Sequence, residues 1–211
     1  MSKIIKITKH CFRLLGYIMS YTFIDKLYNV LLSLWNVIYT GYLEKDFASF
    51  GNSSICWRVY NLVGTKYIHI GNGNAFDRGL QLTAWRTNET EPIIKIGNDC
   101  LFRANAHITA IKSIEIGNNL LTGTNVLITD NAHGSSDFEN LHISPTKRTL
   151  HTKGAVKIGN NVWLGNNVCI MPGVTIGDGV VIGANSIVTH DIPAYCIAAG
   201  IPAQIIKQNR Q

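Results

Sequence analysis

Residues 158–193 read IGNNVWLGNNVCIMPGVTIGDGVVIGANSIVTHDIP, and one pattern returns in them every six residues. Each unit starts with an aliphatic residue, namely Ile158, Leu164, Ile170, Ile176, Ile182 and Val188. A period of six matches neither the turn of an α-helix nor the plain alternation of a strand. The chain must therefore turn a corner every six residues, and three such sides close a triangular coil of about eighteen residues.

The residues between the aliphatic positions favour corners. Glycine follows directly at positions 159, 165, 177 and 183, and Asn or Asp stands beside most corners. These residues accept the positive or strained dihedral angles of a tight turn. The aliphatic residues would point into a prism whose coils pair as short parallel strands about 4.8 Å apart. Roughly seven coils over residues 50–203 would make a prism on the order of 35 Å long.

The same frame continues upstream with two interruptions. It returns as Ile96, Phe102 and Ile108, then as Ile116, Thr122 and Ile128, and in an earlier coil at Ile70. The step from Ile108 to Ile116 is eight residues, which predicts a two-residue bulge. A gap of 30 residues between Ile128 and Ile158 predicts a protruding loop over residues 130–154.

Length and composition restrict the fold further. The 211 residues allow one domain with a small appendage. With 46% hydrophobic and 15% charged residues, the chain is neither disordered nor a coiled coil. The 28 Ile, 20 Asn and 19 Gly favour short strands and tight corners over helical bundles. We predict an all-β fold with a helical amphipathic segment at 1–47, the repeat domain at 48–203 and a basic tail at 204–211.

An amphipathic helix is expected before the repeats. Residues 27–43 form an uncharged run of 17 residues, shorter than the roughly 20 that span a membrane. Its polar residues recur at helical spacing opposite an aliphatic stripe formed by Leu27, Leu31, Leu34 and Ile38. Two interpretations stay open: the apolar face docks on the main domain or a neighbouring subunit, or it attaches to the inner leaflet of a membrane. The basic residues Lys3, Lys6, Lys9 and Arg13 would help the second.

Charge and cysteine content exclude several classes. Residues 1–45 contribute +4 of the formal net charge of +6, but no nucleic-acid motif accompanies them. The five cysteines show no C-x-x-C spacing, so neither a disulfide framework nor a zinc site is predicted. The late apolar run, interrupted by Asp25 and Lys26, does not fit a signal peptide. We expect a cytoplasmic protein, with or without peripheral contact to the inner face of the membrane.

The stretch quoted above resembles the hexapeptide-repeat acyltransferases. Within them it is most similar to the maltose and galactoside acetyltransferase group and to the sugar O-acetyltransferases of surface-polysaccharide gene clusters. The resemblance covers residues 96–207. It implies a left-handed parallel β-helix, a homotrimer with active sites at subunit interfaces, and acetyl-CoA as co-substrate without a metal ion.

The loop at 130–154 holds the predicted catalytic residue. Its start, Thr129-Asp-Asn-Ala-His133-Gly, resembles the catalytic segment of the family, in which a His follows a short polar run. The resemblance implies that His133 removes the proton of an acceptor hydroxyl or amine, which attacks the thioester directly. An imidazole suits this role because its reference pKa of about 6.5 lets it accept and return a proton. Asp130 or a backbone carbonyl would orient the ring.

The resemblance also implies the residues that bind CoA. Trp163 matches the Trp that borders the pantetheine channel, and Asn166 and Ala184 match positions whose backbone contacts the pantetheine amides. Thr189 and His190 match a Thr-Lys pair near the phosphates, so His190 departs from the family by lacking a permanent charge. In the tail, Lys207 matches a basic residue near the 3′-phosphate, whereas Gln204 stands where Arg or Lys is common.

The acceptor side is less determined by the sequence. Asn105 lies near the place where the sugar acetyltransferases put an acceptor-binding Asn. Arg103 and Arg148 could pair with a phosphate or carboxylate of the acceptor. With Asp130, which stands next to the catalytic segment, Asn105 and Arg148 are the predicted substrate-binding residues.

Three other functions compete with sugar O-acetylation on the same prism. A γ-class carbonic anhydrase needs three His around zinc, two of them closely spaced, and the seven His here offer no such pair. A non-catalytic scaffold would not need the Trp163 motif. The sequence does not exclude a streptogramin-type, serine or amino-sugar N-acetyltransferase. Because the N-terminus is basic and amphipathic, we predict an O-acetyltransferase that acts on a sugar in bacterial surface-polysaccharide synthesis.

Overall fold

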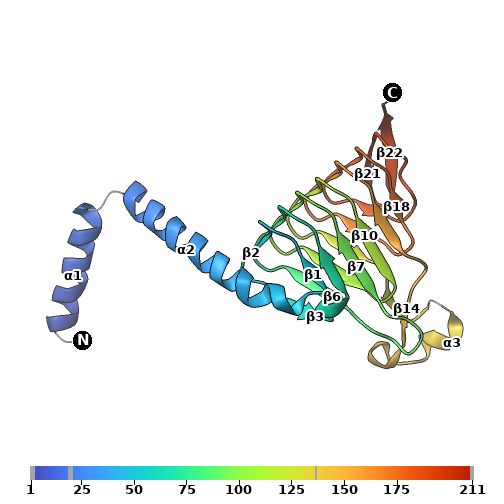
Figure 1. Ribbon diagram of the computed structural model, residues 1–211, viewed down its shortest axis with the longest axis horizontal. Coiled ribbons are helices and arrows are strands. Elements are labelled where there is room, and N and C mark those ends of the chain that lie inside the picture. Colours follow the sequence, from blue (N-terminus) through green and yellow to red (C-terminus); the bar gives the residue numbers. More distant parts are fainter. Residues whose placement is uncertain (1–2, 19–20, 136, 210–211) are drawn as a thin grey trace. The chain divides into compact units, whose positions relative to one another are not determined.

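The six-residue units fold into three stacks of short strands around one triangular core, as the computed structural model shows (Figure 1). The structure describes residues 3–18, 21–135 and 137–209. The chain consists of two compact units, Met1–Ile38 and Tyr39–Gln211. The second unit holds the all-β fold, a left-handed parallel β-helix, and confirms the fold class that the repeat predicts.

Each side of the prism is one sheet. Sheet A contains β1 (Ser49–Phe50), β4 (Ile68–Ile70), β7 (Ile93–Ile96), β10 (Ser113–Ile116), β15 (Val156–Ile158) and β18 (Thr175–Ile176). Sheet B contains β2 (Ile55–Cys56), β5 (Ala75–Phe76), β8 (Leu101–Phe102), β11 (Leu121–Thr122), β16 (Trp163–Leu164), β19 (Val181–Ile182), β21 (Cys196–Gly200) and β22 (Ala203–Gln208). Sheet C contains β3 (Asn61–Val63), β6 (Gln81–Ala84), β9 (His107–Ala110), β12 (Leu127–Thr129), β17 (Cys169–Ile170) and β20 (Ile187–Val188).

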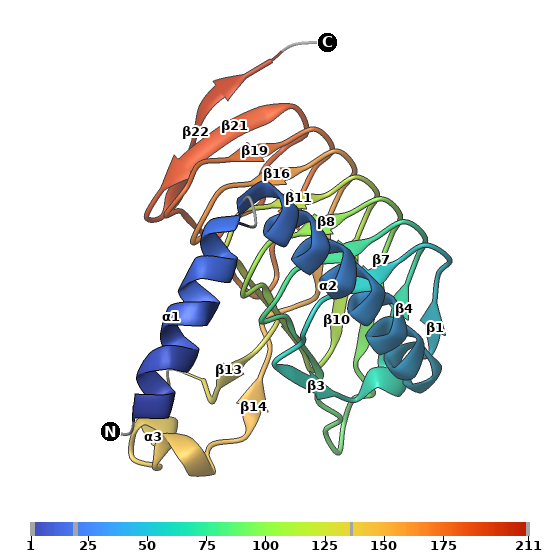
Figure 2. The same cartoon turned by 90° about the vertical axis from the view of Figure 1, so that its left-hand side faces the viewer.

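Neighbouring strands in these sheets are parallel, except that β22 folds back antiparallel on β21. Figure 2 shows the strands of sheet B in this order, from β8 through β11, β16 and β19 to β21 and β22. The chain passes from sheet A to B to C in each coil, so every coil has an A–B, a B–C and a C–A corner. The tail predicted at 204–211 continues β22 as far as Gln208, and residues 210–211 lie outside the described residues.

The core confirms the six-residue period. All six aliphatic residues that start the units between 158 and 188 are at most 4% exposed. A second inward row, which the sequence analysis did not include, lies two residues earlier in each unit: Val156, Val162, Val168, Val174, Val180 and Ser186. Each side of the prism therefore buries two side chains, and Phe76 and Phe102 stack between coils at 5.0 Å. Burial of these rows removes the apolar surface that drives folding.

Asparagines hold the B–C corner in register. Asn105, Asn125, Asn167 and Asn185 all have left-handed backbones, with φ between 56° and 61°. Their side-chain amides form a ladder, in which the Nδ2 group of each Asn donates to the Oδ1 atom of the next at 2.9 to 3.0 Å. Asn tolerates this conformation better than most residues. Asn105, a predicted acceptor-binding residue, is thus a member of a corner ladder.

The two extra residues between Ile108 and Ile116 widen the corner between β9 and β10. Ile114 and Ile116 both point inward and are buried, and Ile111 in the corner is buried as well. The backbone N–H groups of residues 111–113 turn away from the sheets, and the carboxylate of Asp130 accepts all three. A buried corner thus gains the acceptor that its backbone requires.

The 30-residue interruption is a protruding loop, as predicted (Figure 1). It contains β13 (Ala132–His133), α3 (Phe138–Leu141), the 3₁₀ turn η3 (Pro145–Lys147) and β14 (Leu150–His151). β13 and β14 form a two-stranded antiparallel sheet in which His133 is opposite Leu150. Short 3₁₀ turns η1 (Glu44–Asp46) and η2 (Thr65–Tyr67) lie elsewhere in the same unit.

Two helices precede the strands, α1 (Lys3–Ile18) and α2 (Tyr21–Leu43). The last turn of α2 belongs to the second unit, where Leu43 is buried and the Thr40 hydroxyl accepts the Cys56 N–H at 2.9 Å and donates to its carbonyl at 3.3 Å. Among the described residues, no helix is both long enough and apolar enough to cross a bilayer.

Candidate active site

Two pockets flank the β13–β14 hairpin. The first, which we name the His133 pocket, has a volume of about 610 Å³. It lies between the outward face of sheet C and the loop, and its lining includes Gln81, Thr83, Trp85, His107, Thr109, His133, Arg148 and Met171. The second, the His151 pocket, has about 480 Å³ and is lined by Ser135, Asp137, His151, Lys153, Pro172 and Thr189 among others. Ala132 and Met171 line both, so the hairpin separates two adjoining spaces.

The hairpin places His133 at the edge of its pocket. β12 ends at Thr129, the chain turns at Asp130, and pairing with Leu150 fixes the backbone of His133. The imidazole is exposed. Gly134 follows with φ of 78°, and a Cβ there would lie 2.8 Å from the Arg148 Cδ atom. Glycine is therefore required for Arg148 to pack beside the catalytic candidate.

Arg148 lines the pocket but is already engaged by the loop. Its Nε group donates to the Ile143 carbonyl at 2.9 Å, and its Nη2 group donates to the Leu141 carbonyl at 3.4 Å. Arg148 thus lines the pocket with its side chain, while the two hydrogen bonds of its guanidinium group tie together the parts of the loop. The structure places this predicted substrate-binding residue in the same pocket as His133.

The opposite wall is the outward row of sheet C, where the chain offers polar side chains. Gln81 and His107 are lateral neighbours on β6 and β9, and Thr83 and Thr109 follow two residues later. Burial lowers the pKa of His107 below its ordinary value, which favours the neutral imidazole. Among the described residues, the buried hydroxyl of Thr83 has no hydrogen-bond partner. Such a wall, with Trp85 beside it, suits a ligand rich in hydroxyl groups.

His107 and Thr83 are functional candidates that the sequence analysis missed. The signal was present, because His107 precedes Leu127 by 20 residues and the two are register partners. The 20-residue offset brings β9 beside the strand that leads into the His133 segment. A strict spacing of about eighteen residues would have missed this neighbour.

Asp130 has a different place from the one expected. It is fully buried, and its carboxylate accepts the backbone N–H groups of Ile111, Lys112 and Ser113 at 2.8 Å each and the Asn131 amide at 3.1 Å. It lines neither of the two pockets. Asp130 thus anchors the start of the loop to the wide corner. Both of its carboxylate oxygens already accept hydrogen bonds there.

The predicted CoA residues of the central coils lie on another part of the prism. Trp163 is 53% exposed on the outward face of sheet B, between Leu121 and Val181. Asn166 and Ala184 are exposed at successive levels of the B–C corner, where the Asn185 N–H donates to the Asn166 carbonyl at 2.8 Å. The Asn166 side chain accepts the Thr124 N–H at 2.9 Å. Asn105 belongs to the same corner.

Lys207 extends the Trp163 row. It is exposed on β22 and pairs with Ile197, which pairs with Val181, the neighbour of Trp163. At about 4.8 Å per strand, the two residues are separated by roughly 14 Å along the outward face of sheet B.

Thr189 and His190 follow β20 and therefore lie at the C–A corner, with the loop. Both are exposed, and the Thr189 hydroxyl is 2.8 Å from His190 Nδ1. Thr189 lines the His151 pocket. The candidates thus form two groups on one chain: His133, Arg148, Thr189 and His190 around the C–A corner, and Trp163, Asn166, Ala184, Asn105 and Lys207 on sheet B and the B–C corner.

Two further ionisable residues lie apart from the His133 pocket. Arg103 follows β8 at the B–C corner, where its Nη1 group is 3.9 Å from the Asp77 carboxylate. His142 packs edge-on against Phe138, with ring centroids 4.5 Å apart, and lines neither pocket. Within the described ranges, no three His, Cys, Asp or Glu side chains gather as metal ligands. All five cysteines are free thiols.

Comparison with known proteins identifies the repeats. The family model described as bacterial transferase hexapeptide (six repeats) matches residues 155–190, and the one described as hexapeptide repeat of succinyl-transferase matches residues 93–130. A protein provisionally named lipopolysaccharide biosynthesis O-acetyl transferase WbbJ, from Escherichia coli (strain K12), is 41% identical over 106 residues, 48% of this chain and 54% of that protein. The galactoside O-acetyltransferase of the same strain is 40% identical over 122 residues, 54% of each chain. The chain spans about half the length of these curated relatives.

Solved structures share the fold. A hexapeptide-repeat containing acetyltransferase from Vibrio cholerae O1 biovar eltor, complexed with acetyl coenzyme A, aligns with a TM-score of 0.57 and 23% identity. The alignment covers 80% of this chain and 74% of that one. The period, the prism and both model matches agree, so residues 93–130 and 155–190 carry hexapeptide repeats like those of bacterial transferases.

Proposed function

We propose that this protein transfers an acetyl group from acetyl-CoA to a hydroxyl group of a sugar, with His133 as general base. The observation that carries the proposal is the His133 pocket, in which an exposed imidazole faces a space lined by polar side chains and Trp85. The names of the two curated relatives support O-acetylation. The name of the first, which refers to lipopolysaccharide, supports a role in the synthesis of a bacterial surface polysaccharide.

The chemistry needs no covalent enzyme intermediate. His133 accepts the proton of the acceptor hydroxyl as the hydroxyl oxygen attacks the thioester carbonyl carbon. A C–O bond forms, the C–S bond breaks, and the proton passes from the imidazole to the departing CoA sulfur. Gln81, His107 and Thr83 would bind the other hydroxyl groups of the sugar, and the Trp85 ring offers an apolar face to its C–H groups.

Acetyl-CoA is the donor in this proposal because the Vibrio cholerae protein of the same fold is complexed with it. The exposed Trp163 would cover the pantetheine arm, and Lys207 would pair with a phosphate group of CoA. The backbone of Asn166 and Ala184 would contact the pantetheine amides. The free cysteines agree with a reducing compartment, and we propose a cytoplasmic location, where acetyl-CoA is available.

The two groups of candidates support a homotrimer. His133 lies at the C–A corner, whereas Trp163, Asn166 and Ala184 lie on sheet B and at the B–C corner. One CoA molecule can contact both groups if the C–A corner of one subunit faces sheet B of the next. Such an interface joins two different surfaces of the same chain, and it closes into a ring by rotation. We therefore propose three sites per trimer, each shared by two subunits.

Replacement of His133 by Ala tests the proposed function. We expect kcat for acetyl transfer to fall by about 10² to 10⁴, since the general base is lost. The dissociation constant for acetyl-CoA, measured by calorimetry, should stay within about twofold because the proposed binding contacts to CoA come from Trp163, Lys207 and the B–C corner. The assay uses acetyl-CoA with a panel of sugars and amino sugars.

His142→Ala is the matched control, because His142 comes from the same loop but packs on Phe138. It should retain wild-type kcat. A fully active His133→Ala enzyme would contradict the mechanism, and a folded protein that does not bind acetyl-CoA would favour a non-catalytic scaffold.

A further inference from the structure

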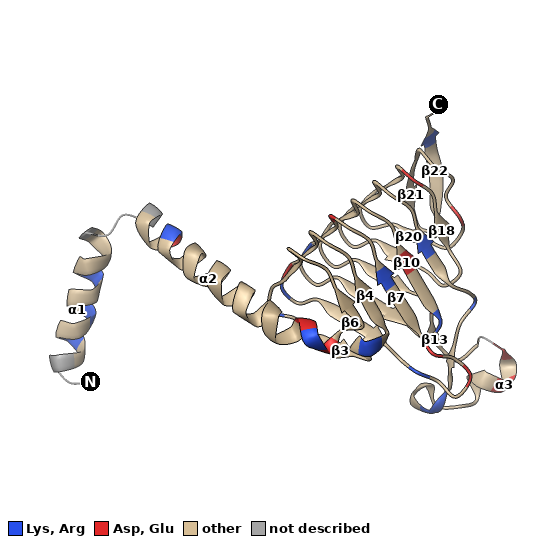
Figure 3. Cartoon of the chain, in the orientation of Figure 1, with Lys and Arg blue, Asp and Glu red and all other residues tan. Residues whose placement is uncertain are grey.

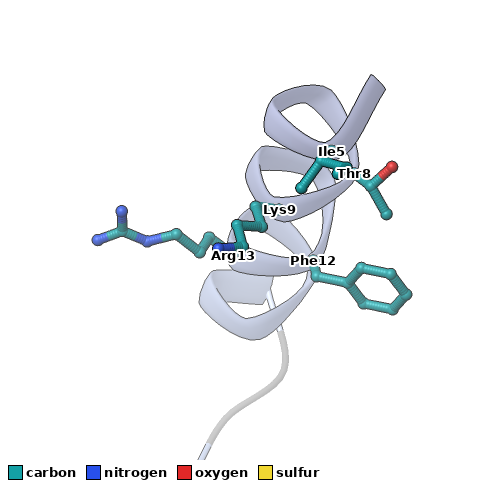
Figure 4. A pocket seen from close by; sticks show the side chains of 5 residues that line it. All are labelled: Ile5, Thr8, Lys9, Phe12 and Arg13. Atoms are coloured by element: carbon teal, nitrogen blue, oxygen red, sulfur yellow. The ribbon is translucent and has the colours of Figure 1, made fainter. Parts of the chain in front are cut away.

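The helix α1 carries positive charge on one side and apolar side chains on the other. Lys6, Lys9 and Arg13 recur at spacings of three and four residues, so they share one side of the helix. Residues 3–18 contain no Asp or Glu. In Figure 3 the described part of α1 is tan with blue bands and has no red band. Figure 4 shows Arg13 and Phe12 extending to different sides of the helix.

The apolar side of α1 is exposed. Ile7 is 60% exposed, Leu14 57% and Leu15 56%. A depression of about 550 Å³ beside the cationic side is lined, among the described residues, by side chains of α1 alone (Figure 4). A 16-residue helix that keeps such residues in water lacks the burial that normally stabilises an amphipathic helix.

We propose that α1 binds flat on the surface of an anionic lipid bilayer, with Ile7, Leu14 and Leu15 inserted among the acyl chains and Lys6, Lys9 and Arg13 at the phosphate groups. Charge complementarity selects this occupant. A second copy of the helix would bring the same cations to the same side and would leave them unneutralised, whereas anionic headgroups neutralise them. The helix is too short to span the bilayer, which requires about 20 residues.

The following helix adds apolar area but no charge preference. α2 exposes Tyr28, Leu31, Leu34 and Trp35, each more than half accessible. Aromatic side chains of this kind favour the membrane interface. Its charged pair at Asp25 and Lys26 is neutral in sum, so α1 alone accounts for a preference for anionic lipid. This inference is independent of the proposed acetyl transfer.

Vesicle co-sedimentation of the full chain tests the proposal. We compare vesicles of phosphatidylcholine alone with vesicles of equimolar phosphatidylcholine and phosphatidylglycerol. Wild type should bind the anionic vesicles more tightly and should be released by salt. The triple variant Lys6→Glu, Lys9→Glu, Arg13→Glu should lose on the order of 100-fold in affinity, because each cation near the surface contributes about fivefold. Leu14→Ser should also weaken binding, because Leu14 lies on the apolar side.

The matched control reverses three exposed cations of the β-helix unit, Arg58→Glu, Arg78→Glu and Lys112→Glu, and changes the net charge by the same amount. It should bind like wild type. Equal binding of the α1 triple variant and wild type would overturn the proposal, as would equal binding of wild type to neutral and anionic vesicles. Loss of vesicle binding in the control to the same degree would also overturn it, because net charge alone would then explain the affinity.

The test separates this inference from the proposed function. Acetyl transfer to a soluble acceptor, measured without vesicles, should be the same in the α1 triple variant and in wild type. That result also shows that the variant is folded. If wild type binds no vesicle but the oligomer dissociates in the triple variant, the helix contacts another copy of the chain and the lipid proposal is wrong.

Discussion

The two imidazoles of the His133 pocket have different surroundings. His133 is exposed on a two-stranded hairpin, whereas His107 lies half-buried on the face of a sheet. Exposure makes the His133 imidazole accessible to a ligand, and burial lowers the pKa of His107, which favours its neutral form. A neutral His107 can donate one hydrogen bond and accept another, which suits a sugar hydroxyl.

The pKa of His107 predicts a pH dependence of stability. Because burial lowers this pKa in the folded protein, the unfolded chain binds the proton more tightly. Protonation therefore favours unfolding, and stability should fall as the pH drops below the unfolded pKa of about 6.5. His107→Gln cannot titrate, so it should lose less stability than wild type between about pH 7.5 and about pH 5. The midpoints of urea unfolding at several pH values measure the difference, and parallel pH curves would contradict it.

At the scale of elements, Asp130 joins the loop to the wide corner between β9 and β10. Asn at this position keeps one oxygen but replaces the other by an NH₂ group, which cannot accept the N–H groups of Lys112 and Ser113. We expect Asp130→Asn to lower the free energy of unfolding by about 2 to 5 kcal/mol, because buried backbone donors lose their acceptors.

Chemical denaturation measures the effect of Asp130→Asn. Asp137→Asn provides the comparison, because the carboxylate of this exposed aspartate of the same loop accepts one hydrogen bond, from the Ser135 hydroxyl at 2.7 Å. Its free energy of unfolding should change by less than about 1 kcal/mol. Equal stability of Asp130→Asn and wild type would show that other groups satisfy the corner.

The elements differ in how far the sequence predicts them. The inward residues Ile158 to Val188 follow from the six-residue period, because a repeat start marks the side chain that faces the axis. Lateral neighbours do not follow, because residues inserted at corners shift the offset between coils from 18, as between Lys157 and Thr175, to 20 or 26. This shift hides the proximity of His107 to the loop. The place of Asp130 was also hidden, since the sequence does not show that a widened corner exposes three N–H groups.

At the scale of the whole molecule, the proposed site shared by two subunits predicts complementation between inactive subunits. His133→Ala disables the C–A half of each site, and Ala184→Trp should block the B–C half by filling an exposed corner. Co-expression of the two variants, with different tags, should restore about one third of wild-type activity in trimers that contain both, because each such trimer has one site of three with two intact halves. Each variant alone should be nearly inactive. Co-expressed His133→Ala and His133→Asn should stay inactive, since both variants disable the same half.

The assay is acetyl transfer by assemblies purified through both tags in sequence. Activity no greater than that of the single variants, in assemblies that contain both tags, would contradict a site shared between subunits. The sequence indicates which residues match the family, but the separation of those residues on two corners becomes visible only in the folded coil.

The strands at the two ends of sheet B, β2 and β22, affect how readily the protein self-associates. A stack of parallel strands normally ends in unpaired N–H and C=O groups, and such an edge can recruit a strand from another molecule and grow into a fibre. Here the Thr40 hydroxyl occupies both the N–H and the carbonyl of Cys56 on the first strand, and β22 folds back over β21 at the other end. The Thr40 hydroxyl thus blocks strand pairing at Cys56, and at the other end an incoming coil would meet β22, whose direction opposes that of the parallel stack.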